Sequence, residues 1–165
     1  LILLACAVTV LALLLQLAVL AAGGEFEQQF PVSLGVPYWL AILGIWIDVA
    51  VVAAFALVMA SISTTPMLPL ALGLAFAVAG RAFGSVKEYV AHGAGGEQAL
   101  VGTYRPLLDL VGWVVPDLSR LDWRAWSMYG LQPDASIEWS GAMALVYVAI
   151  LLMLAIRAFS RREFS

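Results

Sequence analysis

Two long apolar segments, separated only by residues 61–66, constrain the fold of this chain more than any other feature. The first, Val36–Ala60, contains one charge, Asp48, and the second runs from Met67 to about residue 90. Crossing a hydrocarbon core of about 30 Å takes roughly 20 helical residues. Inside lipid the backbone N–H and C=O groups must be satisfied within the segment, so both are predicted to be transmembrane helices joined as a hairpin.

The overall composition agrees with a membrane protein. Hydrophobic residues make up 64% of the chain and charged residues 12%, whereas charged residues make up about 25% of a typical soluble domain. The lipid bilayer is therefore the first partner that the sequence predicts. The net charge of -3 comes without a cluster of Lys or Arg, which argues against a nucleic-acid partner. One Lys beside seven Arg and abundant Ala hints at a GC-rich bacterial genome.

Two further apolar segments, residues 1–22 and 136–158, are also long enough to span a bilayer. The predicted fold is thus an all-α integral membrane protein with four transmembrane helices, a single transmembrane domain over residues 1–165. The first segment begins without Met and without basic residues, so we expect the chain to lack an N-terminal part. A cleaved signal peptide is the alternative, which the length of the segment and its missing basic flank disfavour.

Residues 91–135 form a more polar region that we expect to be interfacial and to lie on the outer side. Within it, Pro106–Pro116 has an apolar face, but about ten helical residues rise only about 15 Å and cannot cross the membrane. This segment is predicted to be a short interfacial or re-entrant helix before the last span. The following segment, Asp117–Trp126, has mixed charge and two tryptophans, which predicts a position at the level of the lipid head groups.

The orientation follows from the end of the last apolar segment, where three arginines lie close together: Arg157, Arg161 and Arg162. Short flanking segments rich in Lys and Arg stay in the cytoplasm. The sequence therefore predicts a plasma (inner) membrane protein with a cytoplasmic C-terminus. With four spans, both ends lie on the same side, the turn at 61–66 is cytoplasmic, and the region 91–135 is outside.

Two charged residues are candidates for an intramembrane function. Asp48 lies near the middle of its span, where a carboxylate costs on the order of 3 kcal/mol. It is either part of a functional site or a neutral side chain hydrogen-bonded to another helix, and the sequence leaves both possibilities open. Arg81 lies toward the end of its span, where its guanidinium can also snorkel to the interface, so a substrate-binding role is the less favoured interpretation.

The sequence offers no recognisable catalytic constellation. It has one histidine, His92, and one cysteine, Cys6, far apart along the chain, so no Cys/His metal spacing exists. The glycine-rich stretch His92–Gly96 lacks the Lys-Ser/Thr pair of a phosphate-binding loop. We therefore expect no catalytic residues, no metal, no cofactor and no enzymatic activity in this chain.

Four short motifs follow one another along the chain: Met59–Pro66, Val78–Glu88, Val115–Trp123 and Ala158–Phe164. In their order and spacing they resemble the permease subunits of exporter-type (type 2) ABC transporters, especially those associated with multi-copper enzyme maturation. The resemblance implies that two of these motifs have a role: a Ser/Thr-rich turn in the cytoplasm, and an outer motif that begins with Pro-Asp-Leu and ends with an Asp. The turn residues are Ser61, Ser63, Thr64, Thr65 and Pro66, and the residues of the outer motif are Pro116, Asp117 and Asp122.

The resemblance implies a permease subunit that forms part of a substrate path and is powered by a separate ATP-binding cassette ATPase. It also implies a second permease copy as a dimer partner. Members of the family have six spans, and this chain would correspond to spans three to six. The chain departs from the family at Asp48, where an apolar or basic residue is expected.

Two other classes of function remain as alternatives. A small structural or accessory subunit in a larger membrane complex would need only apolar helices and small residues at their contacts. A membrane enzyme would need a nucleophile or metal set at membrane depth, and the sequence shows none.

Overall fold

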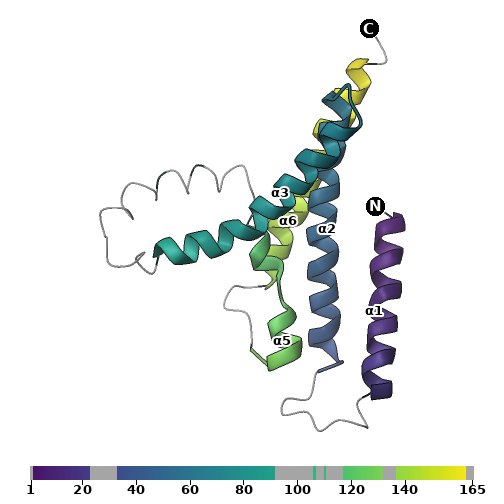
Figure 1. Ribbon diagram of the computed structural model, residues 1–165, viewed down its shortest axis with the longest axis vertical. Coiled ribbons are helices and arrows are strands. Elements are labelled where there is room, and N and C mark those ends of the chain that lie inside the picture. The colour runs from purple at the N-terminus through teal and green to yellow at the C-terminus, as the bar shows by residue number, and fades with distance from the viewer. Residues whose placement is uncertain are drawn as a thin grey trace. The chain divides into compact units, whose positions relative to one another are not determined.

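The computed structural model describes residues 2–22, 33–91, 106, 110, 117–131 and 137–162. All regular elements in these residues are helices (Figure 1). Four are long: α1 (Ile2–Ala22), α2 (Val36–Ile62), α3 (Met67–Ala91) and α6 (Ile137–Arg162). Two are short and precede α6, the 3-10 helix η2 (Leu118–Leu121) and the α-helix α5 (Arg124–Tyr129).

The four long helices are each long and apolar enough to cross a membrane. This confirms the predicted all-α membrane fold, and the chain is a multi-pass membrane protein. Two helices extend beyond the predicted spans, α2 to Ile62 and α6 to Arg162, whereas the apolar part of α3 ends at Val86, before the predicted residue 90. The short helix predicted at Pro106–Pro116 lies, apart from residues 106 and 110, outside the described residues.

The chain divides into two compact units. The first contains Leu1–Ala53 and Leu121–Tyr147, and the second contains Ala54–Arg120 and Val148–Ser165. The long helices α2 and α6 therefore contribute one part to each unit.

In the second unit, α3 packs against the final part of α2 and forms the hairpin that the sequence predicts. The rings of Phe55 and Phe76 stack with centroids 4.1 Å apart and planes 8° from parallel. A Cβ placed on Gly73 would lie 3.3 Å from the Cβ of Ala56. Helices in lipid associate by such close van der Waals contact between small residues, because lipid tails are as apolar as the side chains.

The turn between α2 and α3 is closed by its own hydroxyl groups. Ser61 Oγ donates to the carbonyl of Val58 (2.7 Å), and the amide of Ser63 donates to the carbonyl of Met59 (2.9 Å). Ser63 Oγ also donates to the carbonyl of Thr65 (2.8 Å) and accepts from its amide (3.2 Å). Serine hydroxyls often close turns in this way, so these hydroxyls satisfy the backbone at the end of α2.

In the first unit, a buried phenol links α1 to α2. Tyr38, near the start of α2, donates its hydroxyl to the carbonyl of Ala12 in the middle of α1 (2.5 Å). Both residues are buried. A buried tyrosine hydroxyl needs a partner, and in an apolar helix pair a backbone carbonyl is the acceptor at hand.

Candidate functional site

Trp123, directly after η2, lies between two helices of the first unit. Only 3% of its surface is exposed. A Cβ on Gly44 of α2 would lie 3.1 Å from its Cε3 atom, and a Cβ on Gly141 of α6 would lie 3.8 Å from its Cη2 atom. The indole therefore bridges α2 and α6, each of which has a glycine at the contact. The glycines provide a protein-lined seat for Trp123, and the position of this segment at the level of the lipid head groups stays a prediction.

The backbone before Trp123 approaches the same point of α2. The carbonyl oxygen of Leu121 lies so close to Gly44 that a Cβ there would overlap it. Gly44 lies about 12 Å along α2 from Val36, at about 1.5 Å per residue. The backbone at Leu121 therefore approaches α2 at a glycine, where the missing side chain leaves room for it.

The far end of α5 is tied to the chain just before α2. The amide of Ser33 donates to the carbonyl of Ser127 (3.0 Å), and Ser127 Oγ donates to the carbonyl of Ser33 (3.0 Å). Gly130 ends α5 with a left-handed backbone (φ 68°), a conformation that favours glycine. The segment Leu121–Tyr129, which we call the capping segment, thus contacts Gly44 of α2 at one end and is bonded to Ser33, just before α2, near the other.

Asp48 lies one turn beyond Gly44 on α2, next to Ile47. Its exposed fraction is 7%, so the carboxyl group is enclosed by protein. Ile47 is also buried, and its Cδ1 atom would lie 3.9 Å from a Cβ on Gly141, near the tip of Trp123. The predicted intramembrane candidate therefore lies on the side of α2 that the capping segment and α6 cover.

The capping segment brings a cation near this carboxyl group. Arg124 forms two hydrogen bonds with Asp122, from Nε to Oδ1 (2.7 Å) and from Nη2 to Oδ2 (2.5 Å). Its pKa is raised by this hydrogen bonding, by the charge of Asp122 and, less strongly, by the charge of Asp48, although burial acts in the opposite direction. The Arg124 guanidinium therefore stays charged at any physiological pH, and Asp48 attracts it.

This arrangement has a definite chemical capacity. A carboxyl group in the middle of a membrane helix can bind a proton, a metal cation or the cationic group of a substrate. Asp48 is buried on α2 one turn from Gly44, against which Trp123 packs, and Arg124 contributes a positive charge from the capping segment. The ion pair between Arg124 and Asp122 is itself half exposed, and such pairs contribute only about 0–1 kcal/mol, so its value lies in orienting Arg124.

Asp117 of the predicted outer motif belongs to the second unit and organises η2. Ser119 Oγ donates to its Oδ1 atom (2.5 Å), Arg120 forms an ion pair with its Oδ2 atom (3.3 Å), and the amide of Arg120 donates to its carbonyl (3.3 Å). Asp117 therefore holds the backbone and side chains at the start of η2 in place. Pro116, its neighbour in the motif, lies outside the described residues.

Arg81 also belongs to the second unit, about one turn before Gly84 on α3. A Cβ on Gly84 would overlap the Ser119 side chain and lie 2.8 Å from Asp117 Oδ1. Gly84 thus accommodates η2. Arg81 itself is exposed, as a side chain reaching for the interface would be.

The structure therefore brings only some of the predicted site residues close to one another. Asp48 and Asp122 lie in the first unit, where Arg124 is bonded to Asp122 and its pKa is also raised by the charge of Asp48, whereas Arg81, Asp117 and the turn between α2 and α3 lie in the second. The turn residues Thr64 and Pro66 are exposed. The sequence pointed to Trp123 as a head-group residue only, and it did not single out the two glycines that seat it, Gly44 and Gly141. The available signal was a glycine within an apolar span, which often marks a close helix contact.

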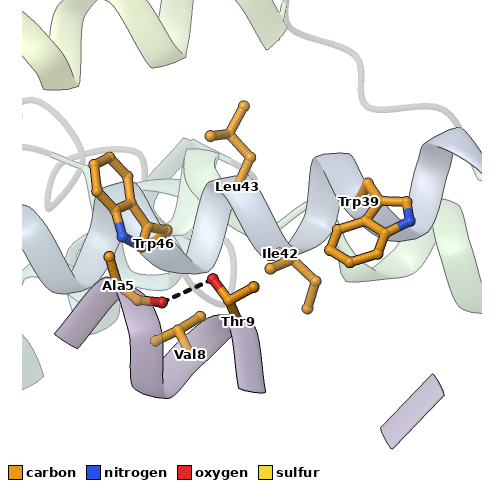
Figure 2. A pocket seen from close by; sticks show the side chains of 7 residues that line it. All are labelled: Ala5, Val8, Thr9, Trp39, Ile42, Leu43 and Trp46. Atoms are coloured by element: carbon orange, nitrogen blue, oxygen red, sulfur yellow. Dashed lines mark hydrogen bonds between the residues drawn. The ribbon is translucent and has the colours of Figure 1, made fainter. Parts of the chain in front are cut away.

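A groove between α1 and α2 lies in the first unit and has a volume of about 410 Å³. Figure 2 shows its lining: Ala5, Val8, Thr9, Trp39, Ile42, Leu43 and Trp46. Thr9 Oγ1 is bonded back to the carbonyl of Ala5 (2.8 Å). The groove therefore presents an uncharged, largely apolar surface, which suits apolar groups and not ionic chemistry.

The described residues contain no group of three or more His, Cys, Asp or Glu side chains that could hold a metal ion. His92 lies outside these residues, and Cys6 is an exposed free thiol on α1. Comparison with models of protein families, with curated proteins and with solved structures finds no match.

Proposed function

We propose that this chain is a transmembrane permease subunit of an exporter-type, ATP-driven transporter and forms part of its substrate path. The observation that carries the proposal is the burial of Asp48 inside protein near the middle of α2. A carboxyl group at this depth is expensive, and it is usually retained where it serves a pathway for ions or substrates.

A separate ABC ATPase and a second permease copy are the partners that complete this proposal. The turn between α2 and α3 supports it, because its hydroxyl groups are used in local bonds while Thr64 and Pro66 remain exposed. Such a preformed, solvent-facing turn is suited to transmit movement from a partner to both helices of the hairpin. The order of the four sequence motifs described above points to the same class of transporter.

A structural subunit of a larger membrane complex is the second candidate. It is favoured by α1, in which Ala12 is the buried residue and most apolar side chains are exposed. Such a surface faces lipid or the helices of a partner. The two functions therefore differ in the partner they require, which is an ATPase for the transporter and other membrane subunits for the structural role.

Site-specific photocrosslinking in native membranes tests the proposal. A photoreactive amino acid at Thr64, in the exposed turn, is expected to capture an ATP-hydrolysing protein from the cytoplasmic side. The same group at Leu131, which is exposed beyond α5, is the matched control and is expected not to capture it. Capture of no ATPase from either position, in a complex of constant stoichiometry, would reject the transporter and support the structural subunit.

We further propose that the protein lies in the plasma (inner) membrane with the α2–α3 turn and its C-terminus in the cytoplasm. The arginines at the end of α6 motivate this orientation. In a Cys6→Ala background, Leu131→Cys is expected to react with an impermeant maleimide in intact cells. Thr64→Cys is expected to react only after permeabilisation. The opposite labelling pattern would invert the topology.

A further inference from the structure

We propose that the capping segment, Leu121–Tyr129, is a lid that shields Asp48 from water at the membrane face where α2 begins, with Trp123 as its plug. The proposal concerns access to the carboxyl group. It therefore holds whether or not an ATPase drives the protein.

The plug is defined by the contacts of one side chain. The five-six ring junction and six-membered ring of Trp123 lie against Gly44, and the far edge of the same ring lies against Gly141. Gly44, Ile47, Asp48 and Val51 follow a spacing of three, four and seven residues, which places them on one face of α2. Trp123 therefore covers the outer end of the face on which Asp48 lies.

The attachment of the capping segment is suited to opening. Its helix α5 has six residues, too few to be stable without docking. The far end is held by the two hydrogen bonds between Ser33 and Ser127. Beyond it, Gly130 ends α5 with a left-handed backbone, and no atom lies within 4 Å of the place where its Cβ would be, so the chain after the lid is not packed against protein at this point.

Charge holds the lid in place as well. Asp48 attracts Arg124, which stands next to Trp123 in the sequence. The other charged group on this part of the segment, Asp122, is already bonded to Arg124. A cation that reached Asp48 would compete with Arg124 for the negative charge of Asp48. Binding of the cation would therefore weaken the attraction that holds the lid closed.

Cysteine accessibility beneath the plug tests the lid directly. Val51→Cys in a Cys6→Ala background places a thiol at a position with 0% exposure, one turn beyond Asp48. A small water-soluble thiol reagent is applied separately to each membrane face, and modification of residue 51 is followed by mass spectrometry. Trp123→Ala is expected to accelerate modification at least tenfold, only from the face where α2 begins. Trp139→Ala, which removes an exposed tryptophan from α6, is the matched control and should leave the rate unchanged.

A reversible lock provides a second test that leaves Trp123 intact. Two hydrogen bonds join Ser127 to the backbone of Ser33, so we choose Ser33→Cys and Ser127→Cys as the pair of cysteines. Formation of the disulfide on oxidation, which would hold the lid shut, is verified by mass spectrometry. The disulfide is expected to slow modification of residue 51 at least threefold, and reduction should restore the rate.

Two outcomes would overturn the lid. One is an equal modification rate in the Trp123→Ala variant and its parent, measured in protein that keeps its helical content. The other is an equal rate in the oxidised and reduced forms of the locked protein, which decides the matter if Trp123→Ala does not fold. Failure to find an ATPase would reject the proposed function, but it would not affect the outcome of these two accessibility tests of the lid.

Discussion

Gly44→Ala is expected to displace the capping segment from α2 and to lower the free energy of unfolding by about 1–3 kcal/mol, the usual cost of overpacking. The added methyl group would overlap the carbonyl oxygen of Leu121 and lie 3.1 Å from Trp123 Cε3. The first of these neighbours is backbone and cannot rotate away. The segment must therefore move as a whole.

Gly141→Ala is the matched control for this prediction. Its added methyl group would lie 3.8 Å from Trp123 Cη2 and 3.9 Å from Ile47 Cδ1, which are ordinary contact distances. Both substitutions replace a helical glycine and gain a similar helix propensity of up to about 1 kcal/mol, so the comparison isolates the steric effect. Unfolding in mixed micelles, followed by circular dichroism, measures it. Equal stability of the two variants would show that Leu121 and Trp123 do not press on Gly44.

Asp48→Leu is expected to reduce transport-linked activity at least tenfold while the protein remains as stable as its parent or becomes more stable. The reason is that the substitution removes a mid-membrane carboxyl group, which costs on the order of 3 kcal/mol, together with its attraction for Arg124. Asp48→Asn preserves the ability to hydrogen-bond and is expected to retain assembly. Loss of activity in Asp48→Leu at unchanged stability would indicate a functional carboxyl group. Loss of assembly in Asp48→Leu, but not in Asp48→Asn, would indicate a structural one.

The measurement pairs activity with assembly in native membranes. Activity is the ATP hydrolysis that co-purifies with the tagged chain, and assembly is the mass of the complex in detergent. Glu138→Gln, at the exposed start of α6, removes a carboxylate from outside the site and should change neither quantity. If the Leu and Asn variants both match their parent in activity, stability and assembly, Asp48 has no role in the function proposed here.

The sequence alone was sufficient for the four membrane helices, because their formation depends on local properties. Each apolar segment is long enough to cross the bilayer, and the helix is the conformation that satisfies its backbone within lipid. The hairpin of α2 and α3 follows from the shortness of the turn between them, and the depth of Asp48 follows from its position within α2. These conclusions need no knowledge of which helices touch.

Only the tertiary structure decided where Trp123 lies. A tryptophan near a helix end is equally consistent with a head-group anchor and with a buried plug, and the choice depends on glycines in two other segments. Gly44 and Gly141 are ordinary residues of apolar helices until the chain places the same indole against both. The link between Asp48 and Arg124 has the same origin, because it joins residues far apart in sequence. Apolar length and backbone bonding act locally and can be recognised along the chain, whereas the seat of a side chain depends on shape complementarity between distant segments, which exists only once they have packed.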